Sequence, residues 1–390
     1  MGQGRVIRAC VMACVVLAVG TSISMAQSAP PSVAQPAPGI AADDLRMTPV
    51  TLPPDLPRAL LEGVTAGGPG WVAVGASVPQ EVGPVDTLIL TSPDGLAWTQ
   101  VPLGDLAQVG SLSDVVAGPM GLVAVGLDHS GTRRDAIALV SADGLAWQAS
   151  TDPNLNGAWM AGAATWGDGV IAVGCRLDRE GLCGRPMAWT STDGLAWDRV
   201  PLPRTSGEPN AVASGEGLLV VMGVSSAIAD GRPVITTTRD LTTWTRRKLP
   251  FEGSLGPAVI DGDQVFAAGT SIDQDGAVLQ RGVVVFSPNA GRRWVRLPLT
   301  APPGSRFAGL SMDGPVITFG SRENRQFQAL PGAWSSRMGV DWTRIRGVPS
   351  SVLGSVTDFA AFPDRAGGIA VGGIGEMGDE TAIWVIDTPG

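Results

Sequence analysis

The stretch S-A-D-G-L-A-W, residues 141–147, decides the fold because the chain repeats it. S-P-D-G-L-A-W ends at Trp98, and S-T-D-G-L-A-W ends at Trp197. Tryptophans at 244, 294 and 342 continue the series, so that successive members are separated by 49, 50, 47, 50 and 48 residues. Self-similarity at such a period is typical of a propeller, a solenoid or an array of small domains.

The contents of each period favour the propeller. An apolar run such as W-V-A-V-G (71–75) is followed by a second, T-L-I-L-T-S (87–92), then by the turn and a third run, W-T-Q-V-P (98–102). A shorter segment such as E-G-V-T-A-G (62–67) precedes them. Each period thus predicts four short strands and no helix. Four-stranded units of this length are propeller blades, whereas tandem sandwiches need about 100 residues a module.

The two ends of the chain give the number of blades. The apolar runs occur a seventh time in G-I-A-V-G-G (368–373) and A-I-W-V-I (382–386), after which the sequence stops without a last strand. Near the other end, L-R-M-T-P-V (45–50) matches L-A-W-T-Q-V (96–101). We therefore expect an all-β, seven-bladed β-propeller over residues 41–390. The N-terminal strand would close the last blade and cover its edge.

The first 40 residues predict export. Arg5 and Arg8 precede an apolar run (9–20) that is too short to span a bilayer, and S-M-A (24–26) is a small-residue cleavage site. We assign residues 1–26 to a signal peptide and 27–40 to a Pro/Ala-rich linker. Cys175 and Cys183 then remain as a close pair, which in an oxidising compartment predicts a disulfide. The expected location is periplasmic or extracellular.

The net charge of the chain limits the classes of partner that it is expected to bind. The formal net charge is −9, and loss of Arg5 and Arg8 makes the mature chain −11 (−9 − 2). Such an acidic, lysine-poor chain is not expected to bind nucleic acid. Nothing after residue 20 predicts a membrane span. A zinc site would need two more ligands beside the cysteines, and the only histidine is His129. We therefore expect no metal, no cofactor and a monomer.

The repeated turns resemble the Asp-box (BNR) repeat, S-x-D-x-G-x-x-W, of sialidase-like propellers. The first three copies lack one residue between Asp and Gly, and the fourth, T-T-R-D-L-T-T-W (237–244), has no glycine. The fifth, S-P-N-A-G-R-R-W (287–294), has the family's length, and S-S-R-M-G-V-D-W (335–342) has Arg337 at the Asp position. The resemblance implies that the turns lie opposite the binding face.

A structural role accounts for the turn residues. A short carboxylate or amide accepts hydrogen bonds from the turn's own N–H groups, glycine adopts positive φ, and tryptophan packs between blades. The residues to which we give this role are Asp94, Gly95 and Trp98; Asp143, Gly144 and Trp147; Asp193, Gly194 and Trp197; Asn289, Gly291 and Trp294; and Gly339 with Trp342.

The chemistry of sialidases is excluded in its usual form, because retaining sialidases use a tyrosine nucleophile and the chain has no tyrosine. Arg185, Arg232 and Arg281 precede the third apolar strand of successive blades and are our candidates for ligand binding. Alternatively, each pairs with acids of its own hairpin, which are Asp178 or Glu180, Asp230, and Asp273 or Asp275.

The sequence favours an exported, non-catalytic module that binds a protein or glycan partner through its variable loops. We assign no catalytic residue. The alternative is a glycoside hydrolase or lyase that uses two carboxylates. Its possible members are Glu62, Glu376, Asp379 and Glu380.

Overall fold

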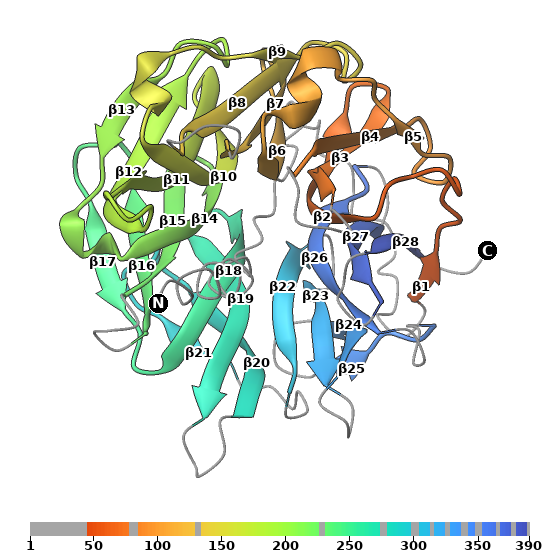
Figure 1. Ribbon diagram of the computed structural model, residues 1–390. Coiled ribbons are helices and arrows are strands. Elements are labelled where there is room, and N and C mark those ends of the chain that lie inside the picture. Colours follow the sequence, from red (N-terminus) through yellow and green to blue (C-terminus); the bar gives the residue numbers. More distant parts are fainter. Residues whose placement is uncertain are drawn as a thin grey trace, which may run out of the picture.

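The computed structural model describes residues 45–77, 85–128, 134–225, 231–273, 279–297, 304–312, 316–323, 328–336, 342–347, 353–363, 367–375 and 380–387. These residues form seven four-stranded antiparallel sheets arranged in a ring, which is the predicted seven-bladed β-propeller (Figure 1). The predicted signal peptide and linker lie outside them, as do His129, Asp230, Asp275, Gly339, Glu376 and Asp379.

Each blade runs from an inner strand near the centre of the ring to a short outer strand. Blade 1 contains β2 (Ala59–Gly67), β3 (Gly70–Ser77), β4 (Thr87–Ser92) and β5 (Thr99–Gln100). Blade 2 contains β6 (Ser111–Gly118), β7 (Gly121–Leu127), β8 (Ala136–Ser141) and β9 (Gln148–Ala149). Blade 3 contains β10 (Ala158–Trp166), β11 (Gly169–Leu177), β12 (Cys183–Ser191) and β13 (Asp198–Pro201). Blade 4 contains β14 (Glu208–Gly215), β15 (Leu218–Val224), β16 (Pro233–Thr238) and β17 (Thr245–Lys248).

The remaining blades repeat this order. Blade 5 contains β18 (Glu252–Asp261), β19 (Gln264–Asp273), β20 (Leu279–Ser287) and β21 (Val295–Arg296). Blade 6 contains β22 (Arg306–Met312), β23 (Val316–Glu323), β24 (Ala329–Ser336) and β25 (Thr343–Arg344). Blade 7 contains β26 (Gly354–Ala361), β27 (Gly368–Ile374), β28 (Glu380–Asp387) and β1 (Arg46–Pro49). Short 3-10 helices follow blades 1 to 3: η2 (Gly104–Gln108), η3 (Pro153–Leu155) and η4 (Arg204–Ser206).

The N-terminal strand closes the ring, as predicted. β1 pairs antiparallel with β28, from Arg46 opposite Asp387 to Pro49 opposite Trp384. Met47, which stands where other blades have the turn's tryptophan, is 1% exposed and packs between blades 6 and 7. The last blade therefore joins both ends of the described chain and leaves no unpaired edge at β28.

The hydrophobic core lies between the blades. Seven buried clusters are found in the described residues, and each contains residues of two adjacent blades. Each inner strand carries a bulge, and in blade 1 it falls between Leu61 and Gly63. A Cβ on Gly75 of the neighbouring strand would collide with the Leu60 carbonyl oxygen, so glycine allows this close pairing.

The turns between third and fourth strands are held by their own polar groups. Asp94 Oδ1 accepts hydrogen bonds from the N–H groups of Leu96 (2.8 Å) and Ala97 (2.9 Å). Trp98 Nε1 donates to the Gly95 carbonyl oxygen at 2.9 Å, and Gly95 has φ 79°. Asp143 and Asp193 make the same pairs of bonds. These bonds hold the pKa of the three aspartates below the ordinary value.

The fourth turn has no glycine, as the sequence shows, and the sixth differs from the sequence interpretation. In the fourth, Asp240 accepts from the N–H groups of Thr242 and Thr243, and Leu241 adopts φ 59° in place of glycine. In the sixth, Ser336 lies opposite Val316, as Ser92 lies opposite Trp71, so the motif begins at Ser336. The placement of Ser335 and Arg337 at the Ser and Asp positions of this turn was therefore wrong by one residue.

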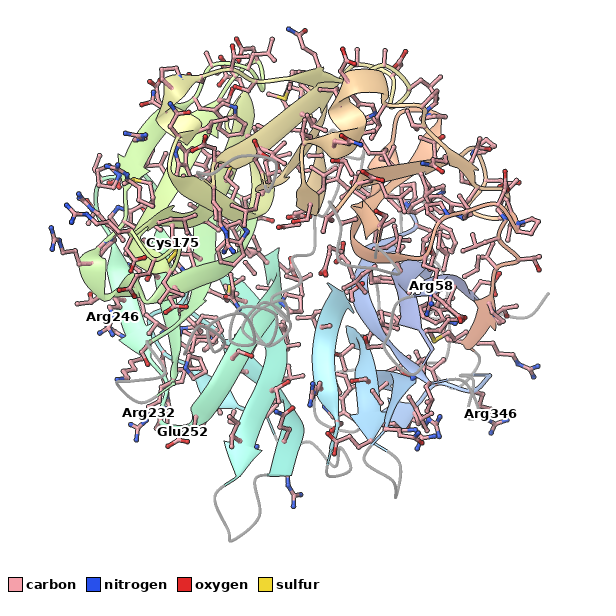
Figure 2. All side chains as sticks on the ribbon, in the orientation of Figure 1. Arg58, Cys175, Arg232, Arg246, Glu252 and Arg346 are labelled. Carbon is pink, nitrogen blue, oxygen red and sulfur yellow. A yellow bond between two sulfur atoms is a disulfide. The ribbon has the colours of Figure 1, made fainter. Side chains whose placement is uncertain are left out.

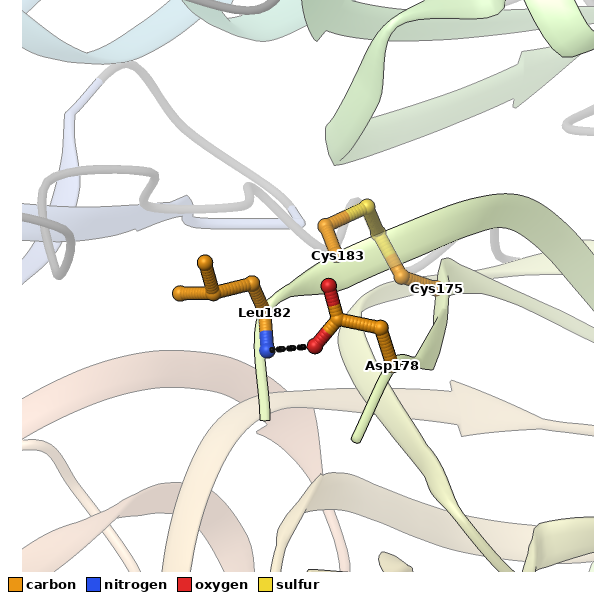
Figure 3. Close-up of a disulfide and its surroundings, with 4 residues drawn as sticks. All are labelled: Cys175, Asp178, Leu182 and Cys183. Carbon is orange, nitrogen blue, oxygen red and sulfur yellow. Dashed lines mark hydrogen bonds between the residues drawn. A yellow bond between two sulfur atoms is a disulfide. The ribbon is translucent and has the colours of Figure 1, made fainter. Parts of the chain in front are cut away.

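The predicted disulfide joins Cys175 and Cys183, whose Cα atoms are 5.3 Å apart (Figure 3). Asp178 Oδ1 accepts hydrogen bonds from the N–H groups of Glu180 and Leu182, both at 2.9 Å. The bridge and the carboxylate together fix the loop between β11 and β12. Within the described residues, no helix is long and apolar enough to cross a membrane.

Candidate functional site

The hairpins between second and third strands end at an equivalent residue in every blade, which we call the rim position. Each second strand contains a glycine equivalent to Gly75, which ends the A-V-G run of blade 1. The rim position lies opposite the residue two places after that glycine, in the third strand or directly before that strand. Backbone pairing places Arg281 opposite Ser271 in blade 5 and Glu380 opposite Ile374 in blade 7. Because the strands are antiparallel, this end of the blade is opposite the Asp-containing turns.

The seven rim positions are divided by charge. In blades 3, 4 and 5 they are arginines, namely Arg185, Arg232 and Arg281. In blades 7, 1 and 2 they are acids, namely Glu380, Asp86 and Asp135. Blade 6 has Leu330, and the residue opposite is Arg322. We call blades 3–6 the arginine half of the ring and blades 7, 1 and 2 the acidic half.

The contacts of the rim arginines bear on the alternative that each one pairs with an acid of its own hairpin. Arg185 is exposed and makes no hydrogen bond or ion pair in the part of the chain that is described. Asp178 of the same hairpin accepts from loop N–H groups through Oδ1. Arg232 and Arg281 are half-buried, and their Nε atoms make no hydrogen bond although both residues have other interactions. Figure 2 labels Arg232 and Glu252 in the same part of the ring, and the N–H of the adjacent Gly253 donates a hydrogen bond to the Gly231 carbonyl oxygen at 2.9 Å.

A second row of arginines lies on the outer strands of the same four blades. Arg344 faces Trp334 in blade 6, and the equivalent residues, at what we call the outer position, are Arg199, Arg246 and Arg296. The acidic half has Pro49, Gln100 and Ala149 there. Residues four apart on a strand point to one face of the sheet, and so do residues paired across two strands. In blade 3, Arg185 is four residues from Trp189, and Trp189 is paired with Arg199. The rim and outer arginines of one blade therefore share a face of the sheet. The sequence interpretation missed Arg322 and the outer row.

The acidic half also holds carboxylates on its inner strands. Asp358 Oδ2 of blade 7 accepts a hydrogen bond from Val64 N–H of blade 1 at 2.8 Å. Asp114 Oδ2 of blade 2 accepts one from Ala163 N–H of blade 3 at the same distance. Both aspartates are completely buried. They therefore join adjacent blades and do not offer a surface to a substrate.

Glu62 lies on β2 between these two aspartates, at the bulge of blade 1. Burial raises the pKa of its carboxyl group to about 8. Burial also raises the pKa of Asp114 and of Asp358, and for Asp358 the charges of Asp114 and Glu62 add to the effect. Two of the predicted members of a carboxylate pair are described: Glu62 belongs to this cluster, and Glu380 lies at the rim. Glu376 and Asp379 lie outside the described residues. Asp114 and Asp358 were missed because only the bulges bring them together.

Metal binding finds no support in the described residues, which contain no group of three or more His, Cys, Asp or Glu arranged to hold an ion. Two features of the described residues can act on a ligand, namely the charged rim and the partly exposed Glu62. The rim can bind anions on one side, whereas Glu62 holds its proton at neutral pH and can donate it.

Comparisons with known proteins show the fold. No protein-family model matches the chain, and no curated protein matches it in sequence. Hydrazine synthase of Kuenenia stuttgartiensis is similar in structure, with TM-score 0.56 and 12% identity over 86% of this chain and 97% of that one. The β-propeller domain of the trilobed protease from Pyrococcus furiosus, described as an open velcro topology, gives 0.50 and 11% over 85% and 94%.

A Penicillium chrysogenum α-L-arabinanase complexed with arabinobiose has TM-score 0.49 and 14% identity, over 87% of this chain and 98% of that one. At such identities the likeness to hydrazine synthase and to the protease domain shows the β-propeller fold and nothing about activity.

Proposed function

We propose that this chain is an exported β-propeller module, with turns of the Asp-box type, that binds a protein or glycan partner through the arginine half of its rim. The observation that carries the proposal is the equivalence of Arg185, Arg232 and Arg281 on three successive blades. Arginines repeated at one position form a single electropositive arc, even on a chain of net negative charge. The Cys175–Cys183 disulfide supports export.

The binding function is tested with a triple variant, Arg185→Gln with Arg232→Gln and Arg281→Gln. The wild type and the variant are compared on a glycan array and in pull-downs from the native cell envelope. We expect the variant to lose the partner that the wild type retains. The matched control is Arg239→Gln, which removes one charge at the opposite end of the blades, where Arg239 Nη2 lies 2.7 Å from Asp263 Oδ1. Equal capture by the triple variant and the wild type would refute the proposal.

A glycoside hydrolase is the second candidate, and the raised pKa of Glu62 favours it. A carboxyl group that keeps its proton at neutral pH can serve as the general acid of such enzymes. Asp114 and Asp358 would then be positioning residues, since both are buried in bonds between blades. Release of reducing sugar from glycans, lost in Glu62→Gln but kept in the triple arginine variant, would favour this candidate over the binding module.

A further inference from the structure

The arginine half contains the same two-residue unit in each of four adjacent blades. A rim-side arginine and an outer arginine share one sheet face in blade 3 (Arg185 and Arg199), blade 4 (Arg232 and Arg246), blade 5 (Arg281 and Arg296) and blade 6 (Arg322 and Arg344). Since successive blades repeat around the ring, the four couples recur at regular intervals. A ligand that contacts them all must carry regularly spaced anionic groups.

The outer arginines are held in place by neighbouring groups. Arg199 donates from Nε (3.0 Å) and Nη2 (2.8 Å) to the Asn154 carbonyl oxygen in the loop that enters blade 3. Arg246 Nε donates to the Thr205 carbonyl oxygen in the next such loop. Arg296 Nη2 donates to Ser271 Oγ at 3.0 Å, and its guanidinium lies 5.5 Å from the centre of the Phe251 ring. A guanidinium has five N–H donors, so each retains others for a ligand.

In blade 6, the rim-side and outer arginines have no such carbonyl or hydroxyl acceptors among the residues that the structure describes. Arg322 and Arg344 make no hydrogen bond or ion pair within the described chain, and Arg322 Nε is buried without an acceptor. Burial and the charge of Arg322 lower the pKa of the Arg344 guanidinium. The two cations therefore lie close enough to repel one another. An anion between them would relieve the repulsion and accept the missing hydrogen bond.

We propose that the four couples form a continuous track for a linear acidic polysaccharide, with one carboxylate of the polymer bound at each couple. This inference rests on the proposed binding function and names its ligand class. One guanidinium binds a carboxylate through two parallel N–H donors, and each couple offers two such groups, a fixed outer arginine and a rim-side arginine. A polysaccharide of one repeating sugar matches the regular recurrence of the couples better than a peptide of mixed sequence.

The test is calorimetry of the full chain with galacturonate and with oligogalacturonates of increasing length. Affinity should rise with length until the four couples are filled and should fall with salt, because each couple adds ionic contacts. Arg185→Gln, Arg232→Gln, Arg281→Gln and Arg322→Gln should each weaken binding of the longest oligomer about tenfold, the effect of one lost charge-assisted contact. Arg239→Gln should leave it unchanged, and thermal melting confirms that each variant is folded.

Three results would overturn the track. Affinity that does not grow beyond the monosaccharide, or a loss confined to one variant, would mean a single anion site and would leave the binding rim in place. Equal binding of polyglutamate, with the same length and salt dependence, would mean that the sugar is not recognised. If oligogalacturonates do not bind while the triple arginine variant still loses its partner on the array, the polysaccharide class is wrong and the proposed function stands.

Discussion

The acidic half and the arginine half share one backbone pattern but use their charges in opposite ways. In blades 7, 1 and 2 the inner strands hold Asp358, Glu62 and Asp114, and both aspartates bind N–H groups of the next blade. In blades 3–6 the arginines lie at the rim and on the outer strands, where solvent reaches them, and the inner strands β14 and β18 begin with Glu208 and Glu252. The buried carboxylates connect neighbouring blades near the closing blade 7, whereas the arginines at the edge of the ring are accessible to a ligand. Arg58 also lies on the side of the acidic half (Figure 2), outside the rim and outer positions.

Deletion of residues 40–53 should have the largest effect, because it removes β1 from the acidic half. β28 would become an exposed edge, and the burial of Leu45 and Met47, worth about 2–5 kcal/mol for each large side chain, would be lost. We expect aggregation and loss of cooperative melting in light scattering and calorimetry. Deletion of 27–38 is the control and should change little. Two truncations of equal stability would contradict closure by β1.

Truncation of the turn tryptophans should come next and should depend on burial. Trp197 is 1% exposed, whereas Trp147 is only partly buried. Trp197→Ala should lower the free energy of unfolding by about 3–5 kcal/mol, and Trp147→Ala by less. Binding by the folded fraction should be unaltered in both, since these turns are opposite the rim. Denaturant titration measures the loss of stability, and calorimetry measures binding by the folded fraction. A larger loss of stability in Trp147→Ala than in Trp197→Ala would contradict the difference in burial.

The inner carboxylates should make stability depend on pH in the acidic half. The folded state raises the pKa of Glu62 from 4.5 to about 8, so between these values it binds more protons than the unfolded chain. The free energy of unfolding should therefore fall as pH rises from about 4.5 to about 8. Asp114 and Asp358 act in the same direction. Glu62→Gln should flatten this slope in urea titrations at several pH values.

Asp358→Asn and Asp358→Ala provide the control for that slope. The amide oxygen of Asn can still accept from Val64 N–H without a charge, whereas Ala leaves that buried N–H unbonded at a cost of about 1–3 kcal/mol. An unchanged slope in Glu62→Gln and Asp358→Asn would show that other groups cause it.

Reduction of the Cys175–Cys183 bridge should have the smallest effect on stability, although it lies in the arginine half. The bridge closes a short loop that Asp178 also holds, so its loss should cost at most about 2–3 kcal/mol. Thiol counting followed by melting of both forms measures it. Free thiols in the native protein, or global unfolding upon reduction, would contradict a local role.

The repeated turn predicted the propeller, the runs near the two ends predicted its seven blades and its closure, and the close pair Cys175 and Cys183 predicted the disulfide. Each of these rests on local patterns or on spacing along the chain. The charge division of the ring was only partly predictable. Arg185, Arg232 and Arg281 occupy one strand position and precede similar apolar runs in the sequence, but Arg322 reaches the rim from the neighbouring strand. Its equivalence is visible only in the backbone pairing.

The inner carboxylates were harder to predict for a physical reason. A bulge adds one residue and changes the face to which the next side chain points. Asp114 and Asp358 follow their bulges directly, and no feature of S-D-V-V or T-D-F-A marks the bulge in sequence. The shift in the sixth turn has a similar origin, since Ser335 and Ser336 are adjacent and only the ladder distinguishes them.

Hydrogen exchange on the complex with the captured partner tests the binding role of the arginine half most directly. The amides of the hairpins that end at Arg185, Arg232, Arg281 and Arg322 should be protected from exchange on binding. Those that end at Asp86, Asp135 and Glu380 should exchange as in the free protein. Protection centred on β2 and Glu62, or spread evenly over all seven rim positions, would contradict binding at the arginine half.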